Sequence, residues 1–282
     1  MSGILYIVGT PIGNLDDFSP RAKETLNLVD FIAAEDTRVT IKLLNRFGIK
    51  KPLISYHEHS QSNRAVQIIK KILDGKNAAI VSDAGMPCIS DPGEKLVRLC
   101  KENDIEVRVI PGPTAAIAAL CISGLDSSRF TFCGFLSTNR KNKLDRISEF
   151  KSLKHTLIFY EAPHKLKSTL NDLLSGLGNR RIAIVKELTK IHESVLTTTL
   201  LEAVNHFNQD DINPKGEHVL VVEGASYDDD DKFPKQSFEE TVCLAKELVL
   251  KGAKPTDAAK QAAFLTNYKK SDIYKALISR DD

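Results

Sequence analysis

Short apolar runs rich in β-branched residues alternate with amphipathic segments along the first 123 residues. Apolar runs without polar alternation are typical of parallel strands that are covered on both faces. Ser19-Pro20 is a typical helix start, and Gly48 and Gly124 are typical left-handed helix ends. The pattern therefore predicts an α/β layered domain over residues 1–123. We expect its strands at Ile4–Val8, Phe31–Ala34, Leu53–Tyr56, Ala78–Ser82 and Val107–Ile110, and helices at Thr37–Phe47, Arg64–Leu73, Gly93–Lys101 and Thr114–Ser123.

A second α/β domain is predicted over residues 124–225 by a similar alternation. We expect strands at Phe130–Phe132, Thr156–Tyr160, Ile182–Val185, Val195–Thr199 and His218–Glu223, with helices at Lys143–Phe150, Lys165–Leu174 and Leu200–Phe207.

The segment 226–236 contains four consecutive aspartates, whose mutual repulsion predicts a solvated acidic linker. Residues 237–282 then predict three short helices, at Phe238–Leu250, Pro255–Leu265 and Ser271–Ile278. Two interpretations of this tail remain open, a helix-turn-helix-like unit or a helical cap on the main body.

Composition narrows the class of protein. In 282 residues, 42% are hydrophobic and 27% charged, which is ordinary for a globular protein of two or three domains. We expect no membrane span and no signal peptide, because no apolar run is long enough and the first residues lack a charged stretch. The five cysteines are scattered without a CxxC pair, which indicates reduced thiols, a cytoplasmic location and no zinc site.

Positive charge is concentrated in residues 137–190, with 12 lysines and arginines against 5 acidic residues. Within this stretch a basic cluster, defined as Arg140, Lys141, Lys143 and Arg146, lies where a loop is expected to enter a helix. Such residues neutralise phosphates, although a solvated helix face is the more common meaning of a charge run. We favour phosphate binding because the rest of the chain is nearly balanced in charge.

Loops rich in glycine and proline follow several predicted strands, and in open α/β sheets ligands bind at such strand ends. They are Val8–Leu15, Val81–Gly93 and Ile110–Leu120 in the first domain, joined by the polar strand ends Phe159–Lys165 and Val185–Lys190 in the second. None has the GxGxxG or P-loop spacing. Together they predict a cleft between the domains, in which Asp83 accepts hydrogen bonds, whereas Asp91 before Pro92 is expected to cap a helix.

Eight segments in order carry a resemblance to a known family: VGTPIGNL, AAEDTR, SYHEH, SDAGMPCISDPG, PGPTAA, YEAPHK, KELTK and GEHVLVVEG. Residues 3–224 resemble the ribosomal RNA small subunit methyltransferase I family of the tetrapyrrole-methylase-like superfamily. The resemblance implies a homodimeric two-domain α/β enzyme that binds S-adenosylmethionine in the cleft. It also implies 2′-O-methylation of a cytidine ribose in the decoding region of 16S rRNA within the small (30S) subunit.

The resemblance implies three sets of cofactor contacts. The first set is Gly9, Thr10 and Pro11. The second set lies in the segments that follow the fourth and fifth strands: Asp83, Ala84, Gly85, Met86, Ile89, Thr114 and Ala115. The third lies on the second domain, with Glu161, Ala162 and Leu188.

Catalytic roles are assigned by residue type and position at strand ends. Glu187, Asp36 and His57 are candidate general bases, and Lys186 is a candidate for stabilising the developing alkoxide. We expect Arg38 to contact RNA together with the basic cluster. His57 and His59 share a face of an extended chain, but further metal ligands are lacking, so we expect no metal site.

Two other functions compete with this one. The first is that of a methylase of the same fold that acts on a tetrapyrrole. The basic stretch 137–190 and the helical tail argue against this function. A catalytically silent RNA-binding module would not need to bind S-adenosylmethionine.

Overall fold

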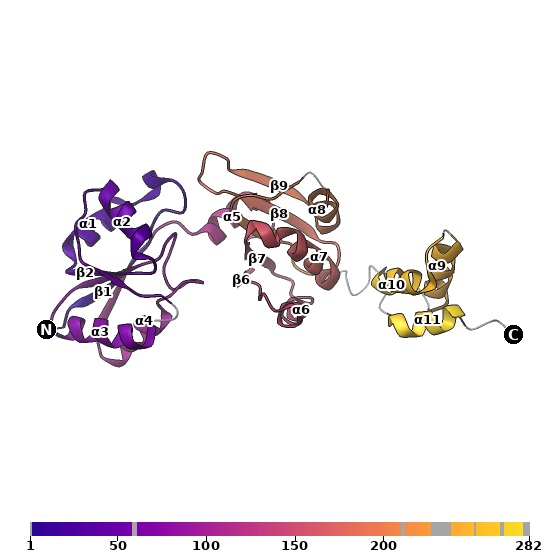
Figure 1. Cartoon of the computed structure of the whole chain (residues 1–282), viewed down its shortest axis with the longest axis horizontal. Helices are drawn as coiled ribbons and strands as arrows, with labels where there is room; N and C mark the ends of the chain where they lie inside the picture. Colours follow the sequence, from indigo (N-terminus) through magenta and orange to yellow (C-terminus); the bar gives the residue numbers. More distant parts are fainter. Residues whose placement is uncertain are drawn as a thin grey trace.

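The computed structural model describes residues 2–57, 61–209, 212–226, 238–250, 252–265 and 268–278. It contains two α/β units followed by a small helical unit at the far end of the molecule (Figure 1). No helix in the described ranges has the length and apolar character needed to cross a membrane.

The first unit is built on a five-stranded sheet of order β3-β2-β4-β1-β5 in which every pairing is parallel. Helices α1 and α2 contribute Leu26 and Leu44 to the core on one face, and α3 and α4 contribute Ile68 and Leu96 to the core on the other. The prediction of parallel strands covered on both faces is therefore confirmed. The elements are β1 (Ile4–Val8), η1 (Leu15–Asp17), α1 (Pro20–Leu28), β2 (Phe31–Ala34), α2 (Thr37–Arg46), β3 (Leu53–Ser55), α3 (Gln61–Leu73), β4 (Ala78–Val81), α4 (Glu94–Glu102) and β5 (Glu106–Ile110).

The second unit has a mixed sheet of order β6-β7-β10-β8-β9, in which only β6 and β7 pair in parallel. Helices α6, α7 and α8 cover one face around Ile147, Leu170 and Leu200. The elements are β6 (Phe130–Phe135), α6 (Arg140–Glu149), β7 (Thr156–Glu161), η3 (Pro163–Lys165), α7 (Leu166–Leu177), β8 (Arg181–Lys186), β9 (Ser194–Thr199), α8 (Leu200–Phe207) and β10 (His218–Val222).

Helix α5 (Ala115–Ser123) packs on the other face of this second sheet, although the sequence pattern predicted it as part of the first domain. Ala116, Ala119 and Leu120 pack in one core with Ile158 and Val221. The helix has apolar residues all round. Its inner side is buried on the sheet, whereas Ile117 and Ile122 on its outer side are 45% and 43% exposed. We therefore propose that the boundary between the two domains lies before α5, near residues 111–114, rather than at 123.

The three predicted helices of the tail are present as α9 (Phe238–Leu250), α10 (Pro255–Leu265) and α11 (Lys270–Ile278). They pack around a small core of their own, made of Ala245, Ala259, Ala262 and Ile273. The predicted acidic linker 226–236 lies, apart from Ser226, outside the described residues, and so does His59.

Candidate functional site

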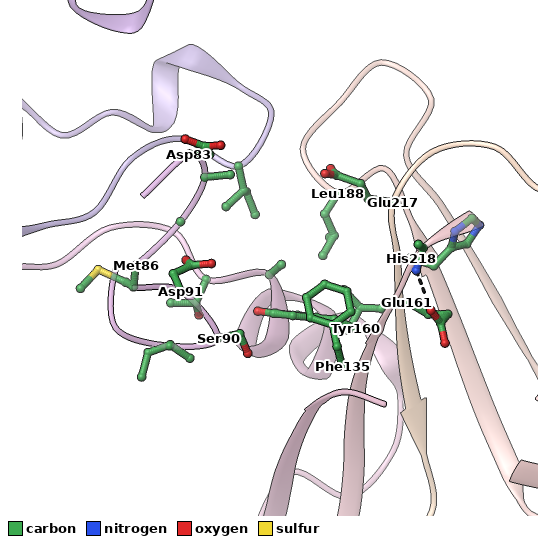
Figure 2. Close-up of a pocket in the computed structure, with 18 of the residues that line it drawn as sticks. Asp83, Met86, Ser90, Asp91, Phe135, Tyr160, Glu161, Leu188, Glu217 and His218 are labelled. Carbon is green, nitrogen blue, oxygen red and sulfur yellow. Dashed lines mark hydrogen bonds between the residues drawn. The ribbon is translucent and has the colours of Figure 1, made fainter. Parts of the chain in front are cut away.

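A cavity of about 360 Å³ lies between the two sheets, at the ends of their strands, and both units line it (Figure 2). From the first unit and the segment that ends it come Ile12, Glu35, Asp83, Ala84, Gly85, Met86, Ile89, Ser90, Asp91 and Thr114. From the second come Ala115 at the start of α5 and Phe135, Tyr160, Glu161, Ala162, Pro163, Val185, Leu188, Glu217, His218 and Val219. Ten of the thirteen residues expected to contact the cofactor are among them, and the predicted location of the cleft agrees with the structure.

The loop 82–93 after β4 forms much of the first wall and has an irregular backbone. Cys88 and Ser90 have φ angles of 72° and 64°, and Gly85 has a φ of 82°. Non-glycine residues in this region cost conformational energy and cluster at functional sites, where the surrounding structure holds them in place. Contacts with the surrounding structure therefore hold this loop in its conformation, and its main support is a backbone segment of the loop that follows β1.

That support comes from Thr10, which pairs with Gly85 through two backbone hydrogen bonds of 2.9 and 3.1 Å. The Thr10 hydroxyl also donates to the Ser82 carbonyl over 3.2 Å. A Cβ atom on Gly9 would lie 2.7 Å from both Gly112 Cα and Met86 Sδ, so this position requires glycine. Gly9, Thr10 and Pro11 do not line the cavity themselves, and Gly9 and Thr10 hold in place the loops that do.

Three carboxyl groups of the first wall have pKa values above their ordinary range. Burial is the main cause for Glu35 and Asp83, with repulsion between neighbouring carboxylates adding to it. Asp91 has a pKa raised to about 6 by burial and by the charges of Glu35 and Asp83, against a hydrogen bond from Ser82. Among the described residues that line the cavity there is no lysine or arginine. This wall is therefore matched to a ligand that brings positive charge.

The expectation that Asp91 caps a helix is wrong. The residue before α4 is Gly93, with a φ of 145° and no side-chain hydrogen bond to the helix. The two residues between Asp91 and α4 change the direction of the chain, and the carboxyl group of Asp91 lines the cavity instead (Figure 2).

The second wall is held rigidly by buried side chains. The Tyr160 hydroxyl accepts a 3.2 Å hydrogen bond from the Ala116 amide, which ties β7 to α5. Glu161 is 5% exposed and accepts hydrogen bonds from the Ala162 amide and the Thr169 hydroxyl. Lys143 donates in turn to Thr169 over 2.8 Å. These fixed groups make the second wall a preformed surface.

The two units are also in contact at the turn between β8 and β9, which follows the cavity residue Leu188. The Thr189 hydroxyl accepts a 3.0 Å hydrogen bond from the Asn14 amide. A Cβ atom on Gly13 would lie 2.6 Å from Lys190 Cγ, so the first loop and this turn are in close contact.

The catalytic candidates Glu187, Lys186 and Asp36 do not line the cavity, and neither does His57. Glu187 accepts hydrogen bonds from the Glu217 amide and from Lys190, both 2.9 Å long, and these contacts lower its pKa. Asp36 is the N-cap residue of α2 and binds Arg38, which lowers the pKa of Asp36 to about 2. As catalytic groups these residues stay predictions that rest on residue type and position at strand ends.

The four residues of the basic cluster differ in exposure and in their ion pairs. Arg140 and Lys141 are exposed in the first turn of α6. Arg146 is exposed but pairs with Glu149 over 2.5 Å and lies over the ring of Phe150. Lys143 is 8% exposed and forms an ion pair of 2.8 Å with Asp172. The expectation that Lys143 contacts RNA is therefore corrected, because its ammonium group is bound inside the second unit.

Arg38 is exposed and its guanidinium is engaged by Asp36. Within the described part of the chain no group of three or more histidine, cysteine or acidic side chains is placed to hold a metal ion.

Sequence reasoning missed several residues of the cavity, among them Glu35, Phe135, Tyr160 and Glu217. Glu35 and Tyr160 lie within motifs that were singled out, so their place at strand ends was a usable signal. Phe135 carried no such signal, because the irregularity that directs it toward the cavity is not evident from the sequence.

Comparisons with known proteins agree with this geometry. Residues 4–204 match the family of tetrapyrrole (corrin/porphyrin) methylases. The ribosomal RNA small subunit methyltransferase I of Synechocystis sp. is 46% identical over 97% of this chain and 96% of its own length. The protein of the same name from Bacillus subtilis is 43% identical over 97% of this chain and 94% of its own.

Solved structures show the same fold. The crystal structure of the methyltransferase CobJ matches with a TM-score of 0.60 and 20% identity, over 79% of this chain and 95% of that one. Diphthine synthase matches with a TM-score of 0.59 and 14% identity, over 79% and 90%. The full-length relatives and the family match together show that the chain belongs to the ribosomal RNA small subunit methyltransferase I family of the tetrapyrrole methylases.

Proposed function

We propose that this protein transfers a methyl group from S-adenosylmethionine to the ribose 2′-oxygen of a cytidine in the decoding region of 16S rRNA. The observation that carries the proposal is an acidic, preformed cavity between two methylase domains whose relatives are named as rRNA methyltransferases. We further propose that the acceptor is the 30S subunit, that the enzyme is a homodimer and that it works in the cytoplasm.

The residues of the cavity fit S-adenosylmethionine. Its volume of about 360 Å³ lies within the range of small-molecule sites. The sulfonium and ammonium groups of the donor outweigh its carboxylate, and the carboxyl groups of Asp83 and Asp91 supply the opposite charge. Met86, Ile89 and Leu188 offer apolar contacts, and the small residues Gly85 and Ala115 allow close approach of a ligand. When bound, the donor supplies an electrophilic methyl group.

The protein's main contribution to transfer is the positioning of the acceptor oxygen behind the methyl group. Glu187 and Asp36 both have lowered pKa values, which makes them weak proton acceptors near neutral pH. Lys186, the last residue of β8, stays our candidate for stabilising negative charge on the acceptor oxygen, although it is not among the residues that line the cavity. We therefore propose that positioning and electrostatics contribute more to the rate than either of these two groups does as a general base.

The phosphates of the RNA are proposed to bind outside the cavity, at Arg140 and Lys141 in the first turn of α6. This separation assigns negative side chains to the cationic donor and positive side chains to the anionic acceptor. Arg38 is a further proposed phosphate contact, at the cost of its ion pair with Asp36.

The substrate class is tested by offering the protein tritiated S-adenosylmethionine with two acceptors, unmodified 30S subunits and a tetrapyrrole. We expect label in the RNA alone. Label in the tetrapyrrole would favour the small-molecule methylase. Failure to bind the donor in calorimetry would favour the silent RNA-binding module.

A further inference from the structure

An exposed aromatic ring, Phe135, stands at the mouth of the cavity (Figure 2). Its side chain is 61% exposed, at the end of β6, which is an edge strand of the second sheet. On the first wall, Ile89 is also exposed, at 52%. The cavity therefore opens between apolar side chains that no part of the described chain covers.

A β-bulge in β6 sets the direction of this ring. The pairing of β6 with β7 shifts by one residue between Phe132 and Gly134, so that Phe135 lies opposite Tyr160. In an unbulged strand residue 134 would occupy that place and Phe135 would lie on the opposite face of the sheet. The bulge thus places Phe132 and Phe135 on the same face as Tyr160 and brings Phe135 to the cavity.

The surroundings fix the ring on one side and leave the other side open. The ring of Tyr160 lies edge to face with Phe135, at 5.4 Å between centroids, and Tyr160 is itself anchored by the Ala116 amide. A Cβ atom on Gly134 would lie 3.3 Å from Ser90 Oγ, so the backbone beside Phe135 abuts the loop of the first wall. The ring is a supported platform rather than a free surface side chain.

Positive charge that follows the ring closely along the chain indicates what the ring binds. Residues 137–142 are all exposed and include Arg140 and Lys141, only five and six positions beyond Phe135. An exposed ring followed within six residues by exposed cations that can neutralise phosphate matches the way proteins hold unpaired nucleotides, with the base stacked and the backbone neutralised.

Building on the proposed function, we propose that Phe135 is the platform on which the base of the target nucleotide stacks while its ribose enters the cavity. A nucleotide whose sugar must reach the methyl donor has to leave the helical stack of the RNA, and an aromatic face replaces part of the stacking that it loses. Phe135 is a substrate-positioning residue in this account, and its ring contributes to RNA recognition and not to binding of the donor.

The test compares Phe135→Ala, Phe135→Leu and Phe135→Tyr in methyl transfer from tritiated S-adenosylmethionine to unmodified 30S subunits. We expect kcat/KM to fall roughly 5- to 150-fold for the alanine variant, the range found when a stacking side chain is removed. Leucine should not restore the rate, because it fills the space without a ring, whereas tyrosine should. Donor affinity in calorimetry should stay within about twofold of wild type. Phe130→Ala is the matched control, since Phe130 is 41% exposed at the other end of β6 and does not line the cavity.

Each other outcome overturns the assignment. Full activity of the leucine variant would mean that only apolar contact matters. An equal loss of donor affinity would make Phe135 part of the cofactor site, and a change of oligomeric state in light scattering would make it part of a subunit interface. If the alanine variant is as active as wild type, the stacking role of Phe135 is refuted and the proposed function stands. If the wild-type protein methylates no RNA, both the proposed function and the stacking role are refuted.

Discussion

Asp91 is expected to make binding of S-adenosylmethionine depend on pH between 5 and 7. Its pKa of about 6 means that the carboxyl group is about nine-tenths ionised at pH 7 and about one-tenth ionised at pH 5. If the ionised form provides the attraction for the cationic donor, affinity should fall up to about tenfold across this interval. The direction follows from the charges, because acid neutralises the carboxylate and leaves the donor positive.

Proton release gives a second measure of the same effect. A cation bound beside Asp91 lowers the pKa of that carboxyl group, so binding near pH 6 should release up to about half a proton. Calorimetry of the donor in two buffers of different ionisation enthalpy measures this number. The Asp91→Asn variant should release less and should bind at pH 7 about as weakly as wild type binds at pH 5.

The control for this experiment is Glu106→Gln, which removes a carboxyl group that pairs with Arg108 outside the cavity. It should leave both the affinity and its pH dependence unchanged. An affinity that is flat from pH 5 to 7 in wild type, or a wild-type pH profile in Asp91→Asn, would refute the reasoning.

Three further predictions follow from the same contacts. Gly9→Val should weaken donor binding about tenfold or more in calorimetry, because its Cβ would meet the Gly112 backbone 2.7 Å away, and unchanged affinity would contradict the supporting role of this loop. Replacing both Arg140 and Lys141 by glutamine should reduce the slope of log affinity for RNA against log salt concentration by roughly 1 to 2, and donor binding should stay intact. An unchanged slope would mean that these two residues form a solvated helix face and do not contact phosphates. Lys143→Met should instead lower the free energy of unfolding by about 2–4 kcal/mol in denaturant titrations, because it leaves the half-buried Asp172 without its ion pair, and it should not change the salt slope.

The strands whose bounds the sequence predicted most accurately are those in which apolar and polar residues do not alternate. Ile4–Val8 and Phe31–Ala34 were predicted with the bounds that the structure has, because buried parallel strands are continuous apolar runs with polar ends. Helix starts were less certain. The helix predicted from Lys143 begins at Arg140, because the Asn139 side chain accepts a hydrogen bond from the Asn142 amide and caps it three residues earlier.

What the sequence did not predict depends on contacts distant along the chain. Helix α5 follows the first sheet in sequence, yet it packs on the second, and a uniformly apolar helix gives no sign of which sheet it covers. Lys143 resembles its charged neighbours in sequence, and only its contacts with Thr169 and Asp172 on α7 distinguish it from them.

The site was predicted from its loops, and the structure adds their electrostatics. Glycine and proline at strand ends located the cavity, since these residues are required where loops approach closely. The raised pKa of Asp91 depends on burial beside Glu35, which follows a different strand. The direction of Phe135 depends on a one-residue bulge that the pattern FTFCGF does not reveal.

The central claim is tested most directly by mapping the methyl group on 30S subunits that have reacted with the purified protein and S-adenosylmethionine. Digestion of the 16S rRNA with nuclease, followed by mass spectrometry and by alkaline hydrolysis, identifies the nucleotide and the position on it. We predict one methyl group on the ribose 2′-oxygen of a single cytidine in the decoding region, which makes the following phosphodiester resistant to alkali. A methyl group on a base, or no methylation of the RNA, would contradict the account.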